Sequence, residues 1–91
     1  MNNVRDNVEK LRYELVVDDM LAIAQYTLDR GILTFTHTVM PKALQGKGVG
    51  SRLIASAVKD ARARRLKVVV RCPFVKAWFA KHPEAQDLLQ H

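Results

Sequence analysis

Apolar and polar residues alternate along segments in the first half of the chain. Residues 12–17 and 32–39 carry apolar side chains at nearly every second position, and residues 20–28 are rich in residues that favour strands. A period of two is typical of strands that bury one face. The short links Asp18-Asp19 and Asp29-Arg30-Gly31 separate these segments, and such links join antiparallel strands in tight hairpins. Three antiparallel strands are therefore predicted.

The spacing of apolar residues changes after Pro41. They recur at intervals of three to five, at Val49, Leu53, Ile54, Ala57, Val58 and Ala61. This spacing predicts an amphipathic helix of about four turns. Residues 67–72 then hold three consecutive valines, and a continuous apolar run is typical of a strand in the interior of a sheet. A strand, a helix and a second strand form a right-handed crossover whose strands are parallel.

Two prolines divide the C-terminal part of the chain. Pro73 suits the first position of a short helix over residues 74–81, and Pro83 opens another that runs towards Leu89, because proline is favoured where a helix begins. The patterns together predict a compact α/β fold, in which antiparallel strands precede a crossover with a parallel strand and short C-terminal helices. With 91 residues the chain suits a single domain, spanning residues 1–91, and excludes a two-domain enzyme.

The net charge of the chain indicates the charge of the partner that it binds. Fifteen lysines and arginines against nine acidic residues give a net charge of +6, which favours an anionic partner. Eleven basic residues and one acidic residue lie between Lys42 and Lys81, whereas the first thirty residues hold four basic and six acidic ones. The cluster Arg62, Arg64 and Arg65 follows the predicted helix, where cations complement the helix dipole, and we interpret it as a solvated helix end.

The sequence shows no pattern for membrane insertion, secretion or metal binding. Its apolar runs fall far short of the roughly 18 residues that a membrane span needs. The first residues are charged or carry amides, unlike the apolar core of a secretion signal. We therefore expect a cytoplasmic protein without a membrane partner. Cys72 is the single cysteine, so it forms neither an intramolecular disulfide nor a zinc site by itself, and no metal is expected.

Three glycines at alternating positions stand between the third strand and the predicted helix, at Gly46, Gly48 and Gly50. Glycines leave backbone N–H groups unscreened at the positive end of a helix dipole, an arrangement that binds phosphate. Lys42, Lys47 and Arg52 flank this loop and would add charge-assisted contacts to a ligand with several phosphates.

The spacing of these glycines excludes three familiar motifs. A Walker loop requires Ser or Thr where Gly48 stands, and a dinucleotide fingerprint requires glycine where Ser51 stands. No two glycines are three positions apart, as the loop of a nucleic-acid-binding KH domain requires. On the glycines alone, a turn selected for tight strand-to-helix packing is an equal alternative to a phosphate site.

Residues 45–50, Gln-Gly-Lys-Gly-Val-Gly, resemble the Gln/Arg-x-x-Gly-x-Gly/Ala loop of the GNAT superfamily of acetyl-CoA-dependent N-acyltransferases. The wider frame is similar to that of small, truncated, single-domain GNAT-like proteins, at Gly31, residues 34–38, Pro41, Leu44, Leu53, Cys72-Pro73-Phe74 and His82-Pro83. This resemblance covers nearly the whole chain. It implies that acetyl-CoA binds between the third strand and the parallel strand, on Gln45, Gly46, Lys47, Gly48, Val49, Gly50, Ser51 and Arg52. The chain lacks the first strand and the helices that usually form the acceptor side, which implies an open acceptor site.

His37 is one candidate for the chemistry. An amine with a pKa of about 10.4 is almost always protonated at neutral pH, so acyl transfer to it needs a base or desolvation. The ordinary pKa of histidine suits that role, and the His-Thr pair belongs to the family frame. His37 shares a predicted strand face with Leu33, Phe35 and Val39, so a hydrogen-bonded core histidine is the alternative.

Cys72 is the second candidate. It follows the parallel strand directly before Pro73, where a thiol could face both the cleft and a helix N-terminus. A thiolate there could accept an acetyl group from a thioester. The alternative is a small buried residue packed against Val70 and Phe74, because free cysteine is among the most buried residue types. The sequence leaves the two interpretations equal.

The main hypothesis is an acetyl-CoA-binding acyltransferase that transfers acetyl to an amine acceptor, either a small molecule or a protein. The first alternative is a CoA-binding module or sensor without efficient catalysis, which acts through a partner. A nucleic-acid binder is disfavoured, because the sequence lacks the aromatic pattern that stacks on bases. The sequence specifies neither the acceptor nor the oligomeric state.

Overall fold

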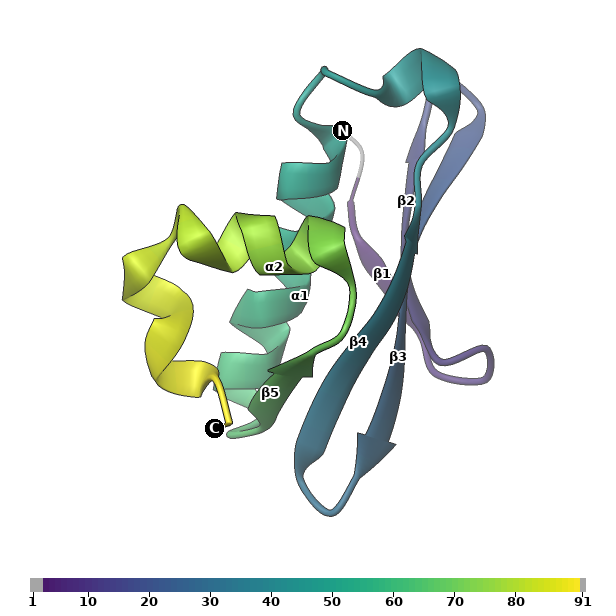
Figure 1. Cartoon of the computed structure of the whole chain (residues 1–91). Helices are drawn as coiled ribbons and strands as arrows, with labels where there is room; N and C mark the ends of the chain where they lie inside the picture. The colour runs from purple at the N-terminus through teal and green to yellow at the C-terminus, as the bar shows by residue number, and fades with distance from the viewer. Residues whose placement is uncertain (1–2, 91) are drawn as a thin grey trace.

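The computed structural model describes residues 3–90, which form one mixed sheet with helices packed against it (Figure 1). Its five strands lie side by side in chain order: β1 (Arg5–Asn7), β2 (Arg12–Val17), β3 (Met20–Asp29), β4 (Ile32–Val39) and β5 (Lys67–Val70). Strands β1 to β4 pair antiparallel, whereas β4 and β5 are parallel. The predicted fold class is confirmed. No helix within residues 3–90 is long and apolar enough to cross a membrane.

Both predicted hairpins turn through residues with positive φ. The β2–β3 link has φ of 51° at Asp18 and 62° at Asp19, and the β3–β4 link has φ of 52° at Arg30 and 79° at Gly31. Two-residue hairpin loops favour this backbone because its twist matches that of the flanking strands. The turns therefore set the register of β2, β3 and β4.

Strand β1 is not among the segments that the alternation predicts. It is short, and it pairs with β2 from Arg5 opposite Glu14 to Asn7 opposite Arg12. Asp6 in its centre accepts a hydrogen bond from the Tyr26 hydroxyl at 2.6 Å. A hydrogen bond from the distant Tyr26 holds this strand in place. The strand therefore has no alternating apolar pattern from which it could be predicted.

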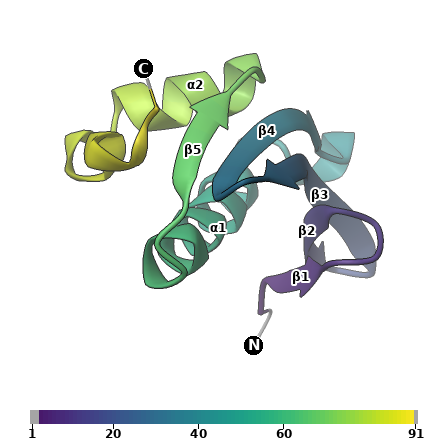
Figure 2. The same ribbon diagram turned by 90° about the horizontal axis from the view of Figure 1, so that it is seen from below.

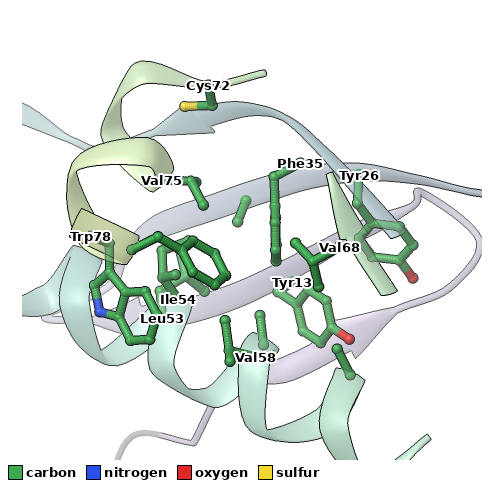
Figure 3. Packing of buried hydrophobic residues seen from close by; sticks show 14 of the residues in the cluster. Tyr13, Tyr26, Phe35, Leu53, Ile54, Val58, Val68, Cys72, Val75 and Trp78 are labelled. Atoms are coloured by element: carbon green, nitrogen blue, oxygen red, sulfur yellow. The ribbon is translucent and has the colours of Figure 1, made fainter. Parts of the chain in front are cut away.

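Helix α1 (Val49–Ala63) closes the core over one face of the sheet (Figure 3). Its buried residues include those on which the helix was predicted: Val49, Leu53, Ile54, Ala57, Val58 and Ala61. They share one cluster with Tyr13 and Phe35 of the sheet. Burial of each large apolar side chain contributes roughly 1.5–3 kcal/mol, so this interface orients α1 on the sheet.

Strand β5 lies at the edge of the sheet, so the predicted interior position is wrong. Val68 is buried, but Val69 and Val70 are half-buried. On the outer edge, the Gln90 N–H donates a hydrogen bond to the Val68 carbonyl at 2.8 Å, and Leu89 forms a parallel bridge with Val68. Packing of the C-terminal segment, rather than a second neighbouring strand, therefore accounts for the apolar character of β5.

Helix α2 (Pro73–Ala80) follows β5 with Pro73 at its first turn, as predicted. The last predicted helix is a 3₁₀ helix, η2 (Pro83–Leu88), and a short 3₁₀ helix, η1 (Lys42–Leu44), lies in the loop after β4. Figure 2 shows α1 and α2 on opposite sides of β5. Both helices nevertheless contribute to one core, because Trp78 of α2 packs in the same cluster as α1.

The arginines at the C-terminal end of α1, Arg62, Arg64 and Arg65, are exposed, as expected of a helix end, but two of them pair with carboxylates. Arg62 binds both carboxylate oxygens of Asp87, at 2.8 and 2.9 Å. Arg64 reaches Asp60 at 3.3 Å and Asp6 at 3.4 Å. The prediction of a merely solvated helix end therefore missed contacts that link α1 to η2 and to β1.

Candidate functional site

A β-bulge in β4 sets the geometry of the candidate site. The pairing of β3 with β4 passes from Tyr26 opposite Phe35 directly to Gln25 opposite His37, so Thr36 is an extra residue in β4. Its hydroxyl donates a hydrogen bond to the Gln25 carbonyl at 3.3 Å. Residues opposite each other in an antiparallel pair share a face. The extra residue therefore exchanges the faces of the residues that follow it.

This exchange places His37 on the outer face of the sheet and Thr38 on the core face. His37 is exposed, whereas Thr38 lies opposite the fully buried Ala24. The prediction that His37 shares a face with Leu33 and Phe35 is therefore wrong. Alternation alone cannot reveal the bulge, because threonine is accepted on either face of a strand.

The glycine loop connects η1 to α1 at the end of β4. Gly46 and Gly48 have φ of 79° and 75°, a backbone conformation that other residues rarely adopt. Gly48 directly precedes the first turn of α1, where N–H groups lack partners within the helix. Together with the helix dipole, these N–H groups form a surface that favours anions.

A cavity of ≈ 720 Å³ opens beside this loop. Six of the eight residues predicted to bind the cofactor line it: Gln45, Gly46, Gly48, Val49, Gly50 and Ser51. Lys47 and Arg52 are exposed and lie outside the lining. The remaining wall includes the end of β4 and three apolar side chains that were not predicted to belong to the site, Met40, Leu44 and Phe74.

Phe74 closes against Gly50 in this cavity. A side-chain carbon added at Gly50 would overlap the tip of the Phe74 ring and lie 3.1 Å from the Met40 methyl group. A side chain at position 50 would therefore require the Phe74 ring of α2 to move away from α1. Phe74 is 43% exposed, whereas Trp78 on the same helix is buried. Trp78 therefore anchors α2 in the core, whereas Phe74 forms part of the cavity wall.

Cys72 lies behind the cavity wall, outside the lining. Its side chain is buried, and its Sγ is 3.3 Å from Oγ1 of Thr38, which lines the cavity. Burial opposes ionisation of the thiol. The Thr38 hydroxyl and the N–H groups of Val75, Phe74 and Thr38 outweigh it, so the pKa of Cys72 lies below its ordinary value. No N–H of α2 meets the sulfur with full capping geometry, so these backbone contacts are weaker than the Thr38 contact.

The structure therefore brings Cys72 together with Thr38 and not with His37. Neither of the two predicted catalytic residues lines the cavity, and their roles stay predictions. Thr38 and Phe74 do line it. Thr38 belongs to the His-Thr strand and Phe74 to the Cys-Pro-Phe turn, the two motifs that carry the family resemblance. The resemblance therefore pointed to both motifs, but it did not indicate which residue of each motif faces the site.

The fold and the loop together define a small α/β domain with backbone N–H groups at the start of a helix, beside a cavity at a strand-to-helix junction. The sequence profile of the GCN5-related N-acetyl-transferases matches residues 12–88. This match spans most of the chain, and the chain therefore belongs to that family of acyltransferases.

A solved structure of the same kind supports the assignment. The chain is similar to a GCN5-like, proposed N-acetyltransferase from Staphylococcus aureus, whose solution structure was determined by NMR. The TM-score is 0.76 at 26% sequence identity, and the alignment covers 97% of this chain and 87% of that chain. No protein with a curated description matches the sequence significantly.

Proposed function

We propose that this chain binds acetyl-CoA at the glycine loop and transfers its acetyl group to an amine. The observation that carries the proposal is the cavity at the end of β4, whose wall includes the glycine loop and the first turn of α1. The N–H groups of that turn suit a phosphate. Membership of an acyltransferase family adds the expectation that the phosphate belongs to a thioester-bearing ligand.

The residues present fit a ligand with a phosphate end and an apolar arm. Carbons added at Gly46 and Gly48 would meet no atom within 4 Å, so the loop backbone is open to a ligand. Met40, Leu44 and Phe74 make other parts of the wall apolar. Lys47 and Arg52, which flank the loop, would attract phosphates through their positive charge.

Bound acetyl-CoA supplies an acetyl group that is activated as a thioester. His37, on the outer face of β4, would accept a proton from an amine that approaches this face, and it can pass the proton to solvent because it is exposed. In this direct transfer the amine nitrogen would bond to the acetyl carbon and displace the CoA sulfur, which takes up a proton. No group of the chain bonds to the acetyl carbon.

Cys72 belongs to a separate, two-step route. Its thiolate would bond to the acetyl carbon and displace the CoA sulfur, which takes up a proton. The amine would then form the amide, lose a proton and release the Cys72 thiolate. Because the bulge at Thr36 turns His37 away from the face that meets Cys72, the two residues are proposed for alternative routes and not for one catalytic pair.

Calorimetric titration with acetyl-CoA tests the binding site. The wild type should bind with a micromolar Kd, and Gly48→Asp should abolish binding without unfolding the chain, because a carboxylate would repel the phosphates. Gly31→Asp is the matched control. Gly31 also has positive φ and open space around it, but it lies in the β3–β4 turn, so this variant carries similar backbone strain and should bind normally.

Two results would contradict the proposal. Equal affinity of Gly48→Asp and the wild type would remove the loop assignment. Absence of binding by the wild type at millimolar acetyl-CoA would remove acetyl-CoA as the ligand.

Turnover with a panel of amines separates an enzyme from a binding module. An acetyl group found on the protein by intact mass spectrometry, and lost in Cys72→Ala, would favour the two-step route. Loss of turnover in His37→Gln with normal binding would favour direct transfer. Tight binding without turnover of any amine would favour a CoA-binding module that acts through a partner.

A further inference from the structure

Thr38 stands where the cavity meets the buried thiol of Cys72. It lines the cavity, and its Oγ1 lies 3.3 Å from the Cys72 Sγ. Cys72 is only 6% exposed, and burial by itself favours the neutral thiol. A sulfur in this position therefore depends on a polar neighbour both for its orientation and for its ionisation.

The bulge at Thr36 makes this contact possible. Without the extra residue, alternation along β4 would turn His37 to the core face and Thr38 to the outer face. With it, Thr38 lies opposite the buried Ala24 and reaches the sulfur. The hydrogen bond from the Thr36 hydroxyl to the carbonyl of Gln25 at 3.3 Å holds the bulge in place. The register of the sheet thus selects the neighbour of Cys72.

We infer that Thr38 is a positioning residue of the site, whose hydroxyl orients the Cys72 sulfur and donates a hydrogen bond to it when the sulfur is ionised. The inference rests on the proposed function, which gives Cys72 a task. In the neutral pair either atom can be the donor. A thiolate only accepts, so in the ionised state the hydroxyl must donate, and a charge-assisted hydrogen bond is stronger than a neutral one.

The groups that act most strongly on the thiol are uncharged. Burial is the largest influence and opposes ionisation; the Thr38 hydroxyl is the largest influence that favours it, followed by N–H groups at the start of α2 and of Thr38 itself. The charged residues nearest in sequence, Arg71 and Lys76, are exposed, and His37 of β4 is on the outer face. Removing the Thr38 hydroxyl should therefore make the Cys72 thiol measurably harder to ionise.

The pH titration of the thiol tests the inference without any cofactor. Ultraviolet thiolate absorbance, with Cys72→Ala subtracted, gives the midpoint. Thr38→Val keeps the branched shape of the side chain and removes the hydroxyl. Its midpoint should rise by about one pH unit, and alkylation by iodoacetamide at neutral pH should slow about tenfold. Thr38→Ser restores a hydroxyl and should return the midpoint to the wild-type value, which a role in packing alone would not predict.

Two control variants address other causes. Thr34→Val removes a half-buried hydroxyl from the same strand, and His37→Gln removes the neighbouring imidazole; neither should move the midpoint. An unchanged midpoint in Thr38→Val, or an equal shift in His37→Gln, overturns the inference. Acetyl-CoA titration of the wild type distinguishes failure of the Thr38 inference from failure of the proposed function. An unchanged midpoint with normal binding counts against Thr38 alone, and absent binding counts against the proposed function.

Discussion

At the scale of single residues, the glycines of the loop meet different physical requirements. Gly46 and Gly48 provide positive φ in open surroundings, whereas Gly50 leaves room for the Phe74 ring. An ordinary glycine in a helix costs roughly 0.5–1 kcal/mol relative to alanine. At Gly50 the absence of a side chain lets the Phe74 ring of α2 pack against α1, where the ring forms part of the cavity wall.

A double-mutant cycle at Gly50 and Phe74 should show this coupling. In the Phe74→Ala background, Gly50→Ala should stabilise the chain by up to about 1 kcal/mol, because alanine favours the helix. In the wild-type background the ring must move, and the gain should be lost, which corresponds to a coupling of about 1–2 kcal/mol. Urea unfolding of the four proteins measures it. Additive effects would mean that the ring moves aside freely and that the contact does not shape the site.

At the scale of elements, a polar cluster ties the far end of α1 to the sheet. The Tyr13 hydroxyl donates to Asp60 of α1 at 2.6 Å, and the Tyr26 hydroxyl donates to Asp6 of β1 at 2.6 Å. Arg64 contacts both carboxylates, and the two tyrosine rings lie 5.2 Å apart. These contacts fix the C-terminal end of α1, so the opposite end of the helix, with the glycine loop, is held in a defined place.

The two tyrosines predict a loss of stability at alkaline pH. Burial and, next, the hydrogen bonds to the carboxylates raise the pKa of Tyr13 and the pKa of Tyr26 above the ordinary value. An unfolded tyrosine ionises at about pH 10, so the stabilisation is complete below that pH and is lost progressively as the pH rises towards the folded-state pKa. Urea unfolding at neutral pH and above about pH 10 should show this decline.

Tyr13→Phe is the variant that assigns the effect. It should lower the free energy of unfolding at neutral pH by about 1–2 kcal/mol, because the Asp60 carboxylate loses the shorter of its two side-chain hydrogen bonds and keeps only Arg64. It should also make the alkaline decline shallower than in the wild type. A decline of unchanged steepness would place the origin of the alkaline effect elsewhere in the chain.

At the scale of the whole molecule, charge is distributed unevenly along the chain. The net charge is +6, and eleven of the fifteen lysines and arginines lie between Lys42 and Lys81, with Asp60 as the one acidic residue there. The glycine loop belongs to this basic part. A phosphorylated ligand would thus be attracted before it contacts the loop, and such attraction is screened by salt.

The affinity for acetyl-CoA should therefore fall several-fold as the salt concentration rises. Acetylpantetheine, which has the same thioester arm but no phosphate, provides the matched ligand control and should bind with little dependence on salt. Calorimetry of both ligands across a salt series measures the difference. The same salt dependence for both ligands would show that phosphate recognition does not contribute, and would argue against the loop as the phosphate site.

Local patterns predicted much of this fold because one-sided burial leaves a period in the sequence. The alternation of Leu33 and Phe35 in β4, before the bulge, and the spacing of Leu53 and Ala57 in α1 indicate directly which side faces the core. Strand β1 was not predicted, because a contact with the distant Tyr26 holds it. The edge position of β5 was not predicted either, because the C-terminal segment covers that strand and so accounts for its apolar residues. The glycine loop could be located because local backbone geometry requires glycine at Gly46 and Gly48.

The sequence by itself determined the antiparallel hairpins, the helix that follows the loop, and most residues that line the cavity. Only the tertiary structure decided that Thr38 meets Cys72, that His37 faces outwards, and that Phe74 closes on Gly50. The physical reason is that one extra residue in a strand reverses the faces of all residues after it at little cost in local propensity. The neighbours of a side chain beyond such a bulge depend on strand pairing and helix packing, which join residues far apart in the chain.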